Sequence, residues 1–147
     1  MSAQNDSNRG TTGTILVVDD YAPSLQLIAR LLAKAGYKVA QSATATSTLQ
    51  QLASGALPDL ILLDVMLGAE TSYSLCQKIK STPKTQGIPI LFLSGLSNAA
   101  DRALATQAGG DDFIIKPFEP AELLTKVASL RQGPRLTRRQ NRKGRWR

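Results

Sequence analysis

The sequence predicts an α/β domain in which helices cover both faces of a five-stranded parallel sheet. Five short runs of branched and aromatic residues alternate with stretches whose apolar residues recur at helical spacing. Because strand and helix alternate, right-handed crossovers favour a doubly wound arrangement of parallel strands. The predicted strands are Ile15–Val18, Tyr37–Ala40, Leu60–Leu63, Ile90–Leu93 and Phe113–Ile115.

A helix is predicted after each of these strands. The stretch 98–108 is rich in alanine and has few large apolar residues, so it is the weakest of these predictions. Glycines follow the helical stretches at Gly36, Gly55 and Gly109, and prolines stand near helix starts at Pro23 and Pro120, as in many helices. In the other four helices the apolar positions are Leu25, Ile28, Leu31, Leu32 and Ala35, then Leu49 and Leu52, then Leu75, Cys76 and Ile79, and finally Leu123, Leu124, Val127 and Leu130.

The length of 147 residues suits one domain, which we place at residues 14–131. Residues 1–13 are polar and are expected to be disordered. The single cysteine, Cys76, cannot form an internal disulfide, which favours a reduced, cytoplasmic protein with an inert core thiol. No apolar run approaches the ~18 residues that a membrane span requires, and no secretion signal is visible.

The net charge of +7 is concentrated at the end of the chain. Residues 132–147 contain seven basic residues and no acidic residue, so eleven basic and eleven acidic residues remain in 1–131. This basic tail is expected to be disordered. A solvated, solubilising tail is one interpretation, and contact with nucleic acid, an anionic membrane or an acidic partner is the other, with Trp146 available for stacking.

Reactive side chains directly follow four of the predicted strands. The absence of histidine leaves carboxylates, hydroxyls and lysine to carry chemistry. Because ligands of open α/β sheets bind beyond the carboxyl ends of the strands, these side chains are expected to share one site. They are Asp19 and Asp20 after the first strand, Asp64 after the third, Ser94 after the fourth and Lys116 after the fifth.

Three carboxylates in one place repel each other unless a cation lies between them. All available ligands are oxygen atoms, which favours a hard divalent ion such as Mg²⁺, or Mn²⁺, over zinc. An aspartate can also attack phosphorus, and Asp64 is the candidate nucleophile. The ion, the Lys116 ammonium and the Ser94 hydroxyl would then each neutralise or bind one phosphoryl oxygen.

The chain resembles the receiver domain of two-component response regulators over residues 14–131. The resemblance rests on the segments ILVVDD ending at Asp20, LILLDVM around Asp64, ILFLSG ending at Gly95 and DDFIIKPF around Lys116. It implies a flavodoxin-like sheet of strand order 2-1-3-4-5 with five helices. A stand-alone receiver would be a phosphoprotein that catalyses only its own phosphoryl transfer and slow autodephosphorylation, rather than an enzyme acting on other substrates.

The resemblance also implies roles for individual residues. Asp64 would accept a phosphoryl group from a sensor histidine kinase or a phosphotransfer protein, in a phosphorelay. Asp19, Asp20, Asp64 and the backbone carbonyl of Met66 would hold Mg²⁺. Ser94 and Phe113 would be the switch residues, Lys116 would match the invariant lysine, and the Lys116-Pro117 bond would be cis. Phosphorylation would then change which downstream partner the domain prefers.

The loop after Asp64 departs from the family pattern. Receivers commonly read M-P-G-M-D-G there, whereas residues 67–72 read LGAETS. We expect Gly68 to loosen this loop. The departure favours one alternative, a receiver-like interaction module that works without phosphorylation. A phosphohydrolase with an aspartate nucleophile is a weaker alternative, because Met66 stands where a second aspartate would be the general acid.

Overall fold

The computed structural model describes residues 13–95 and 99–131; the expectations for the N-terminal segment and the basic tail concern residues outside these ranges. The main sheet contains β1 (Thr14–Val18), β2 (Lys38–Ser42), β3 (Leu60–Asp64), β6 (Ile90–Ser94) and β7 (Asp112–Ile115). All neighbouring strands are parallel, in the order β2-β1-β3-β6-β7. Counted along the chain within this sheet, that is the expected order 2-1-3-4-5.

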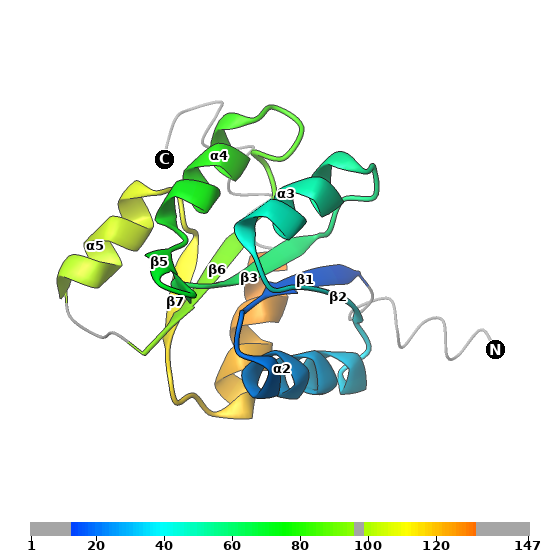
Figure 1. The fold of residues 1–147 in the computed structure, drawn as a ribbon. Helices are drawn as coiled ribbons and strands as arrows, with labels where there is room; N and C mark the ends of the chain where they lie inside the picture. The colour runs from blue at the N-terminus through cyan, green and yellow to red at the C-terminus, as the bar shows by residue number, and fades with distance from the viewer. Residues whose placement is uncertain (1–12, 96–98, 132–147) are drawn as a thin grey trace, which may run out of the picture.

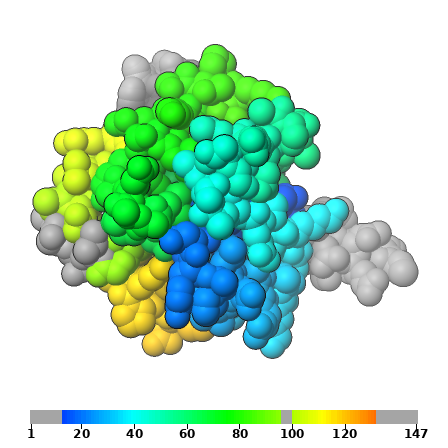
Figure 2. Space-filling model, viewed as in Figure 1, coloured from blue at the N-terminus to red at the C-terminus, as the bar shows by residue number. Residues whose placement is uncertain are grey.

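Helices pack on both faces of the sheet (Figure 1). One face carries α3 (Ala45–Ala53), α4 (Tyr73–Ser81) and α5 (Ala99–Gln107), and the other carries α2 (Ala22–Lys34) and the helix 120–131. The atoms of these helices leave little of the sheet at the surface on the side shown in Figure 2. The predicted doubly wound fold with five helices is confirmed.

Each face of the sheet has its own apolar core, because successive strand residues point to opposite faces. In β1, Leu16 and Val18 pack toward α3, α4 and α5, whereas Ile15 and Val17 pack toward α2 and the helix 120–131. Strand β3 lies between β1 and β6, and residues 60–63 are 0% exposed. The hydrophobic effect therefore fixes β3 from both sides, and Asp64 stands at its end.

A second, two-stranded sheet lies between β3 and α4. Strands β4 (Met66–Leu67) and β5 (Glu70–Thr71) are antiparallel, with Met66 opposite Thr71 and Leu67 opposite Glu70. Gly68 has φ 65°, and a glycine with positive φ at the first of two turn positions is typical of a type II′ hairpin. The loop that departs from the family pattern thus forms a short hairpin beside Asp64, and the expected loosening by Gly68 stays a prediction.

The helices of the described ranges include none with the length and apolar character of a transmembrane span.

Candidate functional site

The carboxyl ends of β1, β3 and β7 bring two carboxylates and one ammonium together. Lys116 Nζ donates a hydrogen bond of 2.9 Å to Asp64 Oδ2 and lies 3.7 Å from Asp19 Oδ2. These residues are separated by 45 or more positions in the sequence, so only the parallel arrangement of the strands makes them neighbours. The sequence prediction that they meet at one edge of the sheet agrees with this geometry.

This cluster is shielded from solvent. Asp19 is 0% exposed, and the side chains of Asp64 and Lys116 are 11% and 27% exposed. Burial raises the pKa of Asp64 above its ordinary value, the Lys116 ammonium acts in the opposite direction, and the neighbouring Asp19 carboxylate raises the pKa further. Two acidic groups thus compete for one partly buried ammonium group.

Asp19 has one satisfied and one unsatisfied carboxylate oxygen. Its Oδ1 accepts a 3.0 Å hydrogen bond from the backbone N–H of Tyr21. Its Oδ2 is buried and has no hydrogen-bond donor in the described part of the chain, apart from the more distant ion pair with Lys116. A buried carboxylate oxygen without a full partner is costly in free energy, which marks this position as a place where a cation would be stabilising.

Asp20 is turned toward the hairpin. Its Oδ2 accepts a 2.9 Å hydrogen bond from the backbone N–H of Gly68, 48 residues away. The hairpin also approaches Asp64 directly, because the N–H of Met66 donates a 3.2 Å bond to Asp64 Oδ1. Across residues 13–95 and 99–131, no three Asp, Glu, His or Cys side chains form a group that could hold a metal ion as they stand. The contact with Gly68 accounts for where the Asp20 carboxylate is directed.

Ser94 and Phe113 lie on the neighbouring strands β6 and β7. Ser94 is buried at the end of β6, and its carbonyl accepts a 2.7 Å bond from the N–H of Lys116. The Lys116-Pro117 peptide bond is cis, as the resemblance implied. Phe113 is partly buried, and the Arg102 guanidinium of α5 lies 5.6 Å from the centre of its ring. The aromatic side chain is therefore held against α5.

Comparison with known proteins gives a consistent result. The family model of the response regulator receiver domain matches residues 15–128. The chain belongs to this family. Receiver domains are signalling domains of phosphorylation-based two-component systems, so a module that ignores phosphorylation is not favoured.

Individual relatives agree with the receiver assignment. The response regulator PleD of Caulobacter vibrioides is 34% identical over 116 residues, which are 79% of this chain and 25% of PleD. Across the curated relatives, the chain spans between a quarter and about half of their length. A putative response regulator from Chloroflexus aurantiacus has a crystal structure with a TM-score of 0.77 and 33% identity, covering 82% of this chain and 98% of that one.

One receiver structure holds the expected ion. The receiver domain of sensor histidine kinase PA1611 from Pseudomonas aeruginosa has magnesium coordinated in its active-site cleft. It matches with a TM-score of 0.72 and 28% identity, covering 80% of this chain and 95% of that one. In the present receiver domain, the carboxylates of Asp19 and Asp64 and the unsatisfied Asp19 Oδ2 fit a hard cation of this kind.

Two contributors to this site were not found by sequence reasoning. Gly68 supplies the N–H that binds Asp20, and Ser72 donates its hydroxyl to the backbone carbonyl of Asp64 over 2.6 Å. Neither residue directly follows a strand of the main sheet, which is where the sequence pattern places reactive side chains. The sequence shows that Gly68 departs from the family pattern. Only the structure shows that the N–H of Gly68 bonds to Asp20.

Proposed function

We propose that Asp64 is the phospho-acceptor of this receiver domain. The observation that supports this most directly is the 2.9 Å contact of Lys116 Nζ with Asp64 Oδ2, beside the buried Asp19. A carboxylate so placed can attack the phosphorus of a partner's phosphohistidine. The new bond joins a carboxylate oxygen to phosphorus, the N–P bond breaks, and its electron pair stays on the imidazole nitrogen.

Lys116 would bind the phosphoryl group as it arrives. Its ammonium already lies between two carboxylates, and the transferred group brings further negative charge to Asp64. In the proposal, Lys116 and the Ser94 hydroxyl each take one phosphoryl oxygen. Ser94 and Phe113 are the proposed switch: Ser94 moves toward the phosphoryl group, and Phe113 turns inward and leaves Arg102.

The proposed Mg²⁺ or Mn²⁺ ligands are Asp19, Asp20, Asp64 and the Met66 backbone carbonyl. The bound ion would neutralise charge on the carboxylates and on one phosphoryl oxygen. Since Asp20 Oδ2 accepts the bond from Gly68, its other oxygen, Oδ1, would serve as the ligand. The fit rests on carboxylate oxygens and on the unsatisfied Asp19 Oδ2.

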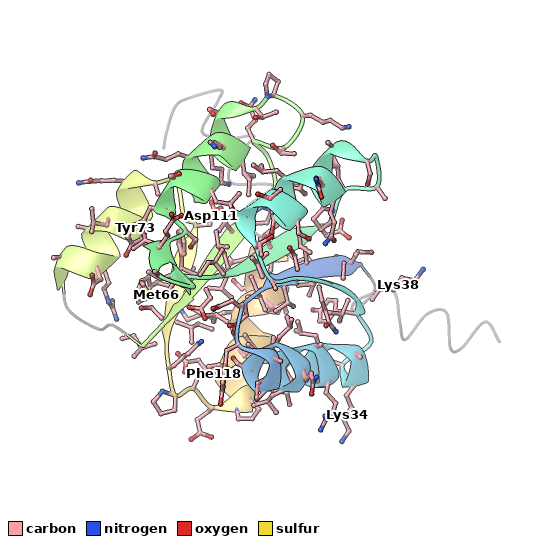
Figure 3. All side chains as sticks on the ribbon, viewed as in Figure 1. Lys34, Lys38, Met66, Tyr73, Asp111 and Phe118 are labelled. Atoms are coloured by element: carbon pink, nitrogen blue, oxygen red, sulfur yellow. The ribbon has the colours of Figure 1, made fainter. Side chains whose placement is uncertain are left out.

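The phosphoryl donor is proposed to dock on an apolar groove that borders the site. The groove has a volume of about 530 Å³ and includes Lys116 in its lining. Tyr21 is 64% exposed and Leu27 is 50% exposed, and these side chains offer apolar contact area in the groove that Lys116 also lines. Phe118, another lining residue, lies beside α2 in Figure 3. A histidine kinase or a phosphotransfer protein is the partner class.

Several further parts of the proposal go beyond the site. The receiver unit is placed at residues 14–131, in the cytoplasm, with a basic tail at 132–147 that is available to nucleic acid or another anionic surface. Loss of the phosphoryl group by water attack is proposed to be slow, because Met66 is apolar and its N–H lies 3.2 Å from Asp64 Oδ1. The apolar Leu96 is proposed to slow water attack in the same way, and it lies outside the described residues.

The test is phosphorylation by a small-molecule donor. Acetyl phosphate and Mg²⁺ are expected to add one phosphoryl group to the wild type, detected by intact-mass spectrometry, and none to Asp64→Asn. Asp112→Asn is the matched control, because Asp112 lies at the other end of β7 and pairs with Lys126. Equal labelling of the wild type and Asp64→Asn would refute the assignment.

A further inference from the structure

Ser72 connects the start of α4 to the acceptor. It is 1% exposed, and its Oγ donates a 2.6 Å hydrogen bond to the backbone carbonyl of Asp64. Its own N–H donates a 2.7 Å bond to the carbonyl of Val65. One residue therefore binds the two consecutive carbonyl groups that follow the nucleophilic side chain.

Ser72 makes these bonds and does not make the N-cap hydrogen bond that is usual for a serine at the start of a helix. It is the N-cap of α4 (Tyr73–Ser81), where a serine hydroxyl ordinarily accepts a bond from the first turn of the helix. Here the side chain makes no such cap bond. By contrast, Thr44 at the N-cap of α3 accepts a 3.0 Å bond from the N–H of Ser47. A local rule that is broken in favour of a bond to a reactive residue indicates a functional constraint.

The segment held by Ser72 contains every main-chain group that the proposed reaction needs after β3. Val65 is bonded on both sides, since its N–H donates a 2.9 Å bond to Leu93 and its carbonyl accepts from Ser72. The next residue is Met66, whose N–H reaches Asp64 Oδ1 and whose carbonyl is the proposed metal ligand. Movement of the 64–66 main chain would displace both the acceptor oxygens and this carbonyl.

We infer that Ser72 is a positioning residue for phosphoryl transfer: its hydroxyl holds the main chain after Asp64 so that the acceptor carboxylate and the Met66 carbonyl keep their orientation. This inference rests on the proposed function of Asp64. Ser72 itself touches neither the phosphoryl group nor the metal. It acts through the backbone, where a small displacement of a reacting group strongly reduces the rate.

Thr85 offers a matched control within the same part of the fold. Thr85 is also buried, at 5% exposed, and its Oγ1 donates a 2.7 Å hydrogen bond to the backbone carbonyl of Ile79 at the far end of α4. Ser72→Ala and Thr85→Ala each remove one buried hydroxyl-to-carbonyl bond. Both should lower the free energy of unfolding, but only the first bond reaches the acceptor.

The experiment compares the wild type, Ser72→Ala and Thr85→Ala in two measurements. The first is the rate of labelling by saturating acetyl phosphate at saturating Mg²⁺. The second is the Mg²⁺ dissociation constant without a phosphodonor, from NMR shifts of the Met66 and Gly68 amides. Ser72→Ala is expected to slow labelling about tenfold and to weaken Mg²⁺ binding, whereas Thr85→Ala changes neither.

Ser72→Gly is the second variant, since it also removes the hydroxyl and suits the φ of −97° at this position. Wild-type behaviour of a folded Ser72→Ala or Ser72→Gly would overturn the inference, and so would equal losses in Thr85→Ala, which would indicate general loosening of α4. Failure of the proposed function itself looks different: the wild type would then take no label at all.

Discussion

At the scale of single residues, the charged groups of the site lower the free energy of unfolding of the protein. Asp19 and Asp64 face one ammonium, and burial together with the Asp19 carboxylate raises the pKa of Asp64. Ionised Asp64 is therefore less favourable in the folded protein than in the unfolded chain at neutral pH. Functional sites commonly retain such unfavourable arrangements.

We predict that Asp64→Asn stabilises the metal-free protein. The substitution removes one of the two competing carboxylates and keeps the shape of the side chain, so the free energy of unfolding at pH 7 should rise by about 0.5–2 kcal/mol, the usual range for a stabilising substitution. Urea unfolding in the presence of EDTA measures this. Asp112→Asn, which breaks only the part-exposed pair with Lys126, should change it little. A loss of stability in Asp64→Asn would contradict the prediction.

The residues found from the sequence share one property. Asp19 and Lys116 each follow an apolar strand and Asp64 ends one, so the strand pattern alone places them at one edge of the sheet. Sequence reasoning could not find the hydrogen-bond partner of each carboxylate. The contacts of Asp20 with Gly68 and of Ser72 with Asp64 depend on the path of a short loop, which no apolar pattern specifies.

At the scale of elements, the hairpin 66–71 is the feature that distinguishes the region after Asp64. Its strands contain two residues each, too few to produce an alternating pattern, so the sequence indicated only an altered loop. Strands β1, β3 and β6 were predictable because their residues are buried on both faces and form continuous apolar runs. The ends of the predicted strands differed by one or two residues; for example, the second strand begins at Lys38 and not at Tyr37.

Gly68 should be the sensitive position of the hairpin. A Cβ added there would meet no atom within 4 Å, so the cost of substitution comes from the positive φ alone. We predict that Gly68→Val lowers the free energy of unfolding by about 1–2 kcal/mol and Gly68→Asn by clearly less, because asparagine tolerates this region. Thermal unfolding compares the two. Equal losses would show that the turn has a different conformation.

Arg102 of α5 should hold Phe113 in its present position. An exposed cation–π contact is worth about 0.5–1 kcal/mol, which is enough to bias a side chain between two positions. We predict that Arg102→Ala lets the Phe113 ring move inward more readily, so that a phosphoryl mimic such as beryllium fluoride shifts its NMR signals at a lower concentration. Arg102→Lys keeps the charge and loses the planar group. Its Phe113 signals are expected to shift at a beryllium fluoride concentration between those of the wild type and Arg102→Ala. An unchanged titration would exclude Arg102 as a restraint.

At the scale of the whole molecule, Cys76 reports on the opening of the core. It is 0% exposed within the core that α3, α4 and α5 cover, and burial raises the pKa of its thiol to about 11. A raised pKa means that this group's contribution to stability is complete below the unfolded pKa and is lost as pH rises through the folded value. The loss should therefore fall between about pH 9 and pH 11.

Since Cys76 is the only cysteine, thiol labelling follows this core without interference. We predict that a thiol reagent at pH 8 leaves the native protein almost unmodified and reacts rapidly in concentrated urea. The wild type should also lose stability from pH 9 to pH 11 more steeply than Cys76→Ala does. Fast labelling of the native protein would show that the core opens locally around α4.

The central position of β3 has a consequence for how a signal can leave the site. With β1 and β6 bonded on either side and residues 60–63 fully covered, the amide hydrogens of β3 should be among the last to exchange with solvent. Asp64, the proposed nucleophile, is thus attached to a strand that should deform little. A change in the chemical state of Asp64 would therefore be transmitted by the loops next to it. These loops would move relative to β3, which keeps its position.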